Sequence, residues 1–210
     1  MKRCAARAAH MSTIILRSGV EVENPLDVAL QFLQAYSGYE ADDSSRPDSF
    51  DERDLRLANR GGARISAAEI AAILERRGEI ESSLRKIGPC TSLTETASSI
   101  PWIALTQLFD AFGNIRGVGF SKMTKALHRK RPALIPMLDS VVQEYLTKDD
   151  PATSSSESFG ARAIAFVRSY KQDLDRNRSP LREIQRELVS RDYRLTEVRI
   201  LDLLIWSVNA

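Results

Sequence analysis

An all-α fold is the class that the sequence predicts, and three observations predict it. Apolar residues recur at the three- and four-residue spacing of amphipathic helices through most of the 210-residue chain. Helix-start signals precede several of these segments, and the clearest is Ser66 followed three residues later by Glu69, which is a capping box. The chain shows no convincing β-hairpin and no internal repeat. We therefore expect a fold built from helices.

The start and stop signals of the helices place them along the chain. Pro25 suits the first position of a helix, and Asn24 can cap it. Asp51 can cap a second, short helix, which Gly61 and Gly62 end. Further helices are expected after Ser66 and over 80–87, 101–112, 120–128, 140–147, 159–175, 180–190 and 196–208.

Two of these helices carry marked apolar faces. In the helix over 101–112, Ile103, Leu108 and Phe112 lie at helical spacing, so the helix should be amphipathic. The last helix, over 196–208, is apolar enough to be an element of the core. Its apolar residues are Val198, Leu201, Leu204, Ile205 and Val208.

Residues 1–23 are expected to form a flexible basic segment, followed by one domain over 24–210. The opening MKRCAARAAH is basic but lacks the apolar core of a secretory signal. No apolar stretch approaches the roughly 20 residues that a membrane-spanning helix needs. We therefore expect a soluble, cytoplasmic protein with no membrane contact.

Cysteine and histidine are too few for a disulfide framework or a metal site. Cys4 and Cys90 are the only cysteines, and His10 and His128 are the only histidines. These four residues cannot supply a four-cysteine iron–sulfur or zinc site, nor a histidine-rich one. The expectation is therefore that the protein uses no metal and no cofactor.

Positive charge is concentrated in one stretch of an otherwise balanced chain. Lys+Arg 30 against Asp+Glu 28 gives a formal charge of +2, yet no acidic residue lies between Asp110 and Asp139. Such a patch predicts a localised site for a polyanion, although basic runs are also common on solvated helix faces. The basic residues of this stretch are Arg116, Lys122, Lys125, Arg129, Lys130 and Arg131.

A glycine turn joins two helices within the same region. The pattern over about residues 101–128 predicts a helix–hairpin–helix, with the turn NIRGVG (114–119) between its helices. Gly117 and Gly119 let the backbone turn tightly and expose its amides beside the N-terminus of the second helix, where they can bind a phosphate oxygen. The alternative is a plain helix cap and turn without a ligand.

The second helix of this hairpin is basic on one face and apolar on the other. Lys122, Lys125 and Arg129 fall at positions i, i+3 and i+7, so they can share a face that follows a nucleic-acid backbone. The opposite face is expected to pack against the helix over 101–112. Its residues are Met123, Ala126 and Leu127.

The hairpin and the later segment PMLDS together resemble the helix–hairpin–helix DNA glycosylases of base-excision repair. Gly117, Val118 and Gly119 match the family's hairpin, and Asp139 matches the aspartate that opens the next helix. The resemblance covers about residues 101–146 and implies DNA binding with a flipped base. It also implies that Asp139 stabilises the cationic sugar left when the base departs, or activates the incoming nucleophile. The stretch LHRKRPALIPMLDSVV further resembles a family of uncharacterised bacterial proteins.

The sequence departs from the glycosylase pattern at several positions. Bifunctional members place a nucleophilic lysine where Ser121 stands, so the resemblance implies a monofunctional enzyme in which Ser121 and its neighbours contact DNA. Lys122, one residue later, is expected to bind phosphate. Met123 replaces an alanine that lets the hairpin helices approach, and Glu144 replaces an arginine found beyond the aspartate. The aromatic candidates for stacking on a base are Trp102, Phe120 and Tyr145.

Two local assignments have a purely structural alternative. Asp139 before Ser-Val-Val suits an N-cap, which would stabilise the fold by about 1 kcal/mol without any chemistry. Asn59, Arg60 and Arg64 could form a second polar wall of a cleft, or a capped loop with solvated charges.

Three hypotheses for function follow. The first is a DNA-binding protein that resembles a monofunctional DNA glycosylase acting on a modified or mispaired base. The second is a non-catalytic helix–hairpin–helix module that grips the DNA backbone within a repair or defence complex. The third is a helical protein whose basic face binds an acidic protein partner.

Overall fold

The computed structural model describes residues 13–35, 39, 46–147 and 157–209, and nearly all of their regular structure is helical. This confirms the all-α prediction. The α-helices are α1 (Pro25–Ala35), α3 (Glu52–Arg60), α4 (Ala67–Glu75), α5 (Arg77–Lys86), α6 (Trp102–Asp110), α7 (Phe120–His128), α8 (Ser140–Thr147), α9 (Phe159–Arg176), α10 (Arg178–Val189) and α11 (Glu197–Asn209).

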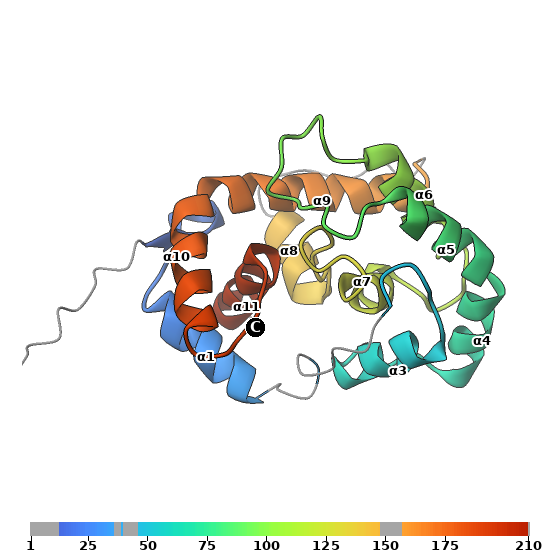
Figure 1. The fold of residues 1–210 in the computed structure, drawn as a ribbon, viewed down its shortest axis with the longest axis horizontal. Coiled ribbons are helices and arrows are strands. Elements are labelled where there is room, and N and C mark those ends of the chain that lie inside the picture. Colours follow the sequence, from blue (N-terminus) through green and yellow to red (C-terminus); the bar gives the residue numbers. More distant parts are fainter. Residues whose placement is uncertain (1–12, 36–38, 40–45, 148–156, 210) are drawn as a thin grey trace, which may run out of the picture.

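The helices form two groups that α9 connects (Figure 1). At one end of the molecule, α1, α10 and α11 pack together, and we call these three helices the terminal lobe. At the other end, α3, α4, α5 and α6 follow one another in an arc, which we call the arc lobe. The 18-residue α9 runs along one side, packing on α6 at one end and contacting α8 and α11. Between the lobes lie α7, which packs on α3, and α8, which packs on α11.

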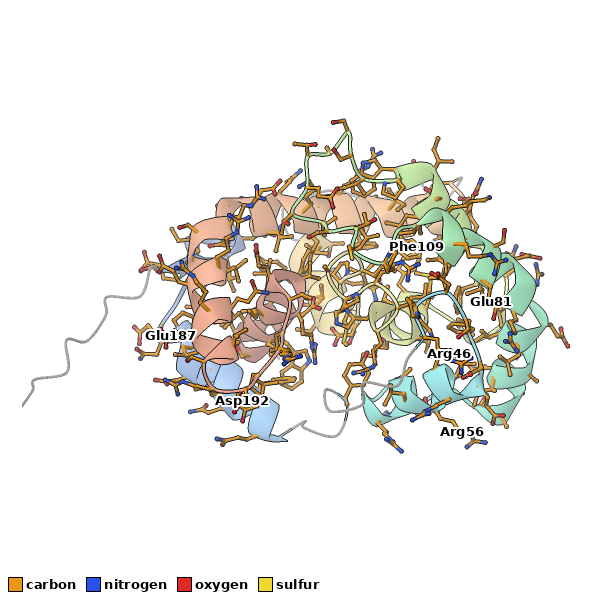
Figure 2. The ribbon with its side chains drawn as sticks, in the orientation of Figure 1. Arg46, Arg56, Glu81, Phe109, Glu187 and Asp192 are labelled. Atoms are coloured by element: carbon orange, nitrogen blue, oxygen red, sulfur yellow. The ribbon has the colours of Figure 1, made fainter. Side chains whose placement is uncertain are left out.

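Apolar side chains fill the space between these helices as one continuous core that extends through both lobes. Phe109 on α6 is fully buried in this core, whereas Arg56 on α3 and Glu187 on α10 lie on the outside (Figure 2). The burial of apolar area is the main force that holds the lobes together.

The predicted caps at Asp51 and Ser66 are confirmed. The Asp51 carboxylate accepts a hydrogen bond from the Arg53 backbone N–H, and the Asp54 carboxylate accepts one from the Asp51 N–H, which makes a capping box at the start of α3. Ser66 and Glu69 form the expected box at the start of α4. These reciprocal bonds satisfy amides that a helix N-terminus leaves without partners.

A short β-hairpin within residues 13–23 corrects two predictions: that this part of the chain belongs to a flexible segment, and that no hairpin is present. Strands β1 (Ile14–Ile15) and β2 (Glu21–Val22) pair antiparallel around the 3-10 turn η1 (Arg17–Gly19). Ile14, Leu16 and Val22 are buried in the core. The strands are only two residues long, too short for the alternation that predicts a strand. Residues 1–12, with Cys4 and His10, lie outside the described part of the chain.

Arg17 attaches this hairpin to α8 and α9. Its guanidinium pairs with Asp173 at 2.7 Å and donates hydrogen bonds to the backbone oxygens of Leu146 and Ser169. The side chains of both members of the ion pair are buried, at 6% and 0% exposure. The hairpin is therefore held in place by one arginine. Its partners lie more than 120 residues away in sequence, so no local pattern predicts the hairpin.

The predicted faces of the α6 and α7 helices are confirmed only in part. Leu108 is buried, but Ile103 is 78% exposed because it lies five residues, or about 140°, away from Leu108 around the helix. Met123, Ala126 and Leu127 on α7 are buried as expected. However, α7 packs most closely on α3, whereas we had expected the helix over 101–112.

Replacing Arg17 with methionine should lower the free energy of unfolding by about 3 kcal/mol or more, because the Asp173 carboxylate stays buried after its close partner is lost. Arg176 Nη1 lies 3.4 Å from Asp173 Oδ1, but this side chain is half exposed, so it would replace the lost Arg17 ion pair only weakly. Urea unfolding at neutral pH measures the loss. The control is Arg178→Met on the exposed start of α10, which should change the stability by less than about 0.5 kcal/mol. Equal effects of the two changes would contradict a stabilising role for the Arg17 contacts.

Candidate functional site

Two of the six basic residues in the acid-free stretch are interior residues. Lys130 is 2% exposed, and its ammonium lies 2.6 Å from the Asp54 carboxylate. Arg131 is 0% exposed and donates to the backbone oxygens of Leu84 and Ile87. These two charges hold the arc lobe together and cannot contact an external polyanion. The predicted polyanion site is correspondingly smaller than the charge pattern indicated.

The glycine turn adopts the conformation that its sequence predicts. Gly117 has a φ of +83°, a left-handed value that favours glycine, and Gly119 is the N-cap residue of α7. Val118 is buried between them. A side chain at Gly117 would also collide with the carboxylate of Glu69, which lies against the turn from α4. The expected tight turn is therefore present, its Val118 N–H donates to the Ile115 backbone oxygen, and a carboxylate lies beside it.

Lys122 is held by the same carboxylate. Its ammonium lies 2.6 and 2.8 Å from the two oxygens of Glu69. Burial opposes ionisation of Glu69, but the hydrogen bonds from Lys122 and Ser66 together keep its pKa below the ordinary value. Lys122 was predicted to bind phosphate, and any such contact has to replace this ion pair.

The other two basic residues predicted on this face point to different partners. Lys125 is 13% exposed, its ammonium is 4.0 Å from Asp139 Oδ2, and burial lowers its pKa while Asp139 opposes that shift. Arg129 donates to the backbone oxygen of Tyr39 at 2.7 Å and lies over the Tyr39 ring. Ser121 is half-buried. The face is therefore a set of three separate interactions rather than an open basic row.

Asp139 is the N-cap of α8, which confirms the structural one of the two roles that the sequence left as alternatives. Its Oδ1 accepts a hydrogen bond of 3.1 Å from the backbone N–H of Val142, so it caps α8. Its Oδ2 faces Lys125, and the side chain is 18% exposed in the wall of a pocket. One oxygen is used by the helix cap, and the other faces Lys125 in the wall of the pocket.

The pocket lies where the terminal lobe meets α7, α8 and the loop after α3, and its volume is about 310 Å³. Phe32 and Trp206 pack edge to face, with ring centroids 5.3 Å apart. Tyr39 covers Gly61 so closely that a Cβ there would lie 2.8 Å from its ring. The lining residues are Phe32, Tyr39, Gly61, Gly62, Arg64, Lys125, Met137, Asp139, Val142, Arg199, Asp202, Leu203 and Trp206.

A second carboxylate, Asp202 on α11, lies in the wall of this pocket. It is 2% exposed, and its Oδ2 accepts a hydrogen bond from the Met137 N–H at 3.1 Å. Its buried Oδ1 has no hydrogen-bond partner among the described residues. Burial raises the pKa of Asp202 to about 7, although the nearby Arg199 guanidinium favours the charged form.

The aromatic residues of the pocket are not those proposed from the sequence. Trp102 donates its indole N–H to the Ala97 backbone oxygen, and Phe120 packs against Phe159. Tyr145 is buried and its hydroxyl accepts a hydrogen bond from the Arg17 N–H. None of these three proposed residues lines the pocket. The residues missed are Phe32, Tyr39, Arg199, Asp202 and Trp206.

The segment after α3 forms both a capped loop and part of a polar pocket wall, which the sequence had left as alternatives. The Asn59 side chain donates to the Ile65 backbone oxygen and accepts from the Ile65 N–H, which closes the loop. Arg64 is exposed, has a φ of +55° and lines the pocket. Asn59 thus belongs to the capped loop, whereas Arg64 belongs to the polar wall.

Within the described ranges, the structure holds no group of three or more acidic, histidine or cysteine side chains that could ligate a metal. The helices of the same ranges are all too short or too polar to cross a membrane.

These features define an all-α protein with a pocket of aromatic and charged side chains beside the glycine turn that joins α6 and α7. The chain belongs to a family of unknown function, DUF6308, whose family model matches residues 30–209. The matched range includes every residue that lines the pocket. Comparison with the curated proteins and with the solved structures gives no match.

Asp202→Asn should stabilise the protein at pH 8 far more than at pH 4. The folded-state pKa of about 7 exceeds the ordinary value of 3.8, so the folded chain retains a proton that the unfolded chain loses. The carboxyl therefore costs stability progressively between about pH 4 and 7, by on the order of 4 kcal/mol in total. Urea unfolding of both proteins at pH 4 and 8 measures the difference. Glu187→Gln on the exposed face of α10 is the control, and a pH-independent difference for Asp202→Asn would contradict the shifted pKa.

Proposed function

We propose that the protein binds DNA and accepts an extrahelical base in the Asp139 pocket, where it acts as a monofunctional base-excision glycosylase. The observation that carries this proposal is the position of Asp139. Its second carboxylate oxygen faces a pocket that begins beside the helix following the glycine turn. Glycosidic cleavage passes through an oxocarbenium-like state, and a partly buried carboxylate next to the sugar stabilises that charge.

The dimensions and lining of the pocket support this assignment. A volume of about 310 Å³ is within the range of small-ligand sites, and aromatic rings form part of the wall. Rings of this kind can stack on a flipped base. In this arrangement Lys125 interacts with Asp139 and with the ligand, because its ammonium lies in the same wall.

DNA contact in this proposal comes from the turn and from the cations that remain accessible. Gly119 has open space around the position of a side chain, and Arg116 is exposed on the turn. Arg64 is exposed at the pocket. Glu69 opposes this contact, since its carboxylate lies against Gly117 and would repel a phosphate.

The monofunctional character rests on the amines near the turn. Ser121 has no amine, the amine of Lys122 is engaged by Glu69, and the amine of Lys125, which lies in the pocket wall, is assigned to pairing with Asp139. Base removal should therefore leave an intact abasic strand.

The alternative is a non-catalytic DNA-binding module, and one observation favours it. The Asp139 carboxylate caps α8 through Val142 and approaches Lys125, so the fold by itself accounts for an aspartate at this position. A module and an enzyme differ in base release but not in DNA binding.

Glu69→Gln should raise the affinity for duplex DNA about fivefold at low salt, because one unit charge about 4 Å from a phosphate in water costs about 1 kcal/mol. The gain should shrink as salt is added. Fluorescence anisotropy with a labelled duplex measures the affinity. Glu75→Gln, on the exposed side of the same helix, is the matched control. No detectable binding by any of these proteins at low salt would refute both DNA-based functions.

Asp139→Asn should abolish release of a base and leave the DNA affinity unchanged or higher, because the amide keeps the capping oxygen but loses the charge. Release is followed on duplexes that carry single modified or mispaired bases. The abasic product is then cleaved with alkali. Asp175→Asn on α9 serves as a control. Absence of release by the wild type from every such duplex would favour the module. A covalent adduct trapped by borohydride and lost in Lys125→Ala would overturn the monofunctional assignment.

A further inference from the structure

Three exposed arginines, which we call the α3 arginine row, lie along the outer face of α3. Arg53, Arg56 and Arg60 occupy positions i, i+3 and i+7, within an arc of about 60° around the helix. The buried Leu55 and Ala58 lie on the opposite side of α3, and Figure 2 shows Arg56 on the outside of the molecule. The row spans about 10 Å along the helix axis, which is the length of about three nucleotides of one DNA strand.

The row borders two pockets in the surface of the arc lobe, with volumes of about 360 and 340 Å³. Arg53 and Leu57 line both pockets, so the two lie side by side along α3. Six basic residues and three acidic ones line the pair. The basic residues are Arg46, Arg53, Arg56, Arg60, Arg77 and Lys130.

The three acidic residues of these pockets already have partners in the fold. Asp54 accepts hydrogen bonds from the buried Lys130 ammonium and from the backbone of Asp51. Asp51 in turn caps α3 through Oδ1, and Glu52 pairs with Arg56. Lys130 and Asp54 cancel inside the protein, so five exposed arginines face two exposed carboxylates. Positive charge therefore remains in excess at this surface, as a polyanion site requires.

The C-terminal end of α3 leads directly into the Asp139 pocket. Gly61 and Gly62, which follow Arg60, line that pocket together with the exposed Arg64. Consecutive Cα atoms are only about 3.8 Å apart, so the last arginine of the row lies close to the pocket wall. A DNA strand with one base in the pocket would bring its neighbouring phosphates near this end of α3.

We propose that the α3 arginine row binds the phosphate backbone of a DNA strand beside the base held in the Asp139 pocket. The planar guanidinium suits this role, because it donates two parallel hydrogen bonds to a phosphate. The inference rests on the proposed function in that it names the path of the DNA to the same pocket. This contact is separate from the glycine turn and lies outside the basic stretch that the sequence analysis singled out.

The salt dependence of binding to a labelled single-stranded oligothymidylate, measured by fluorescence anisotropy, tests the row. Replacing Arg53, Arg56 and Arg60 together with glutamine should weaken binding at least about tenfold at low salt. The slope of log K against log salt should flatten by about 2, because each phosphate contact on a single strand contributes about 0.7.

A matched control replaces three exposed arginines of α10 with glutamine. Arg178, Arg182 and Arg186 also lie on one helix face, but no residue of α10 lines the Asp139 pocket. The charge change is the same in both triple variants. The control should therefore leave the slope unchanged.

Three results would overturn the inference: no binding of the oligothymidylate by the wild type at low salt, equal losses in the two triple variants, or equally tight binding of an oligoglutamate of the same charge. The last result would assign the row to an acidic protein partner. If the triple variant does not fold, Arg56→Gln alone decides, because this side chain is 71% exposed and its ion pair with Glu52 lies at the surface. This single change should flatten the slope by about 0.7, and an unchanged slope would refute the contact.

Failure of the proposed function has a different signature. A protein whose α3 arginine row sets the salt slope but which releases no base retains this surface and loses the glycosylase. One that releases a base, and whose DNA affinity is the same with and without the row, does the reverse.

Discussion

The burial of the Arg131 guanidinium is the constraint on which the arc lobe depends. A guanidinium cannot lose its charge under ordinary conditions, so its N–H groups need acceptors wherever it is excluded from water. The backbone oxygens of Leu84 and Ile87 at the end of α5, that of Pro47 before α3, and the Asp48 carboxylate supply them. Two segments far apart in sequence are thereby held around one side chain. Lys130 and Asp54 add a buried ion pair one residue away.

This internal use of charge changes what the basic stretch indicates about function. A run of cations without carboxylates predicts a polyanion site only if the side chains reach solvent. Here the balancing carboxylates come from elsewhere: Asp54 and Glu69 from the arc lobe, and Asp139 from the start of α8. A local count of charge cannot include partners that folding brings in. The surface that the proposed DNA contact would use is therefore centred on the glycine turn rather than on the whole stretch.

The features that could be predicted from the sequence are those that depend on neighbouring residues. The cap at Asp51, the capping box at Ser66, the turn at Gly117 and the helix that begins after Asp139 all depend on residues within a few positions of one another. The pocket was not predictable in this way, since α1 and α11 bring together residues from opposite ends of the matched range. Asp202 was the one residue that indicated the pocket, because a single carboxylate within the apolar run VRILDLLIW has to be buried or to serve a function.

The attachment of Arg17 connects the N-terminal hairpin to the candidate site over a distance. Arg17 contacts the last turn of α8 through the Leu146 backbone oxygen, and Asp139 caps the first turn of the same eight-residue helix. A short helix moves as a rigid rod, so a shift at one end is transmitted to the other, about 10 Å away. The N-terminal β-hairpin thus helps to fix the position of the Asp139 carboxylate through α8. A substitution in this peripheral segment would therefore shift the Asp139 carboxylate while leaving every pocket residue unchanged.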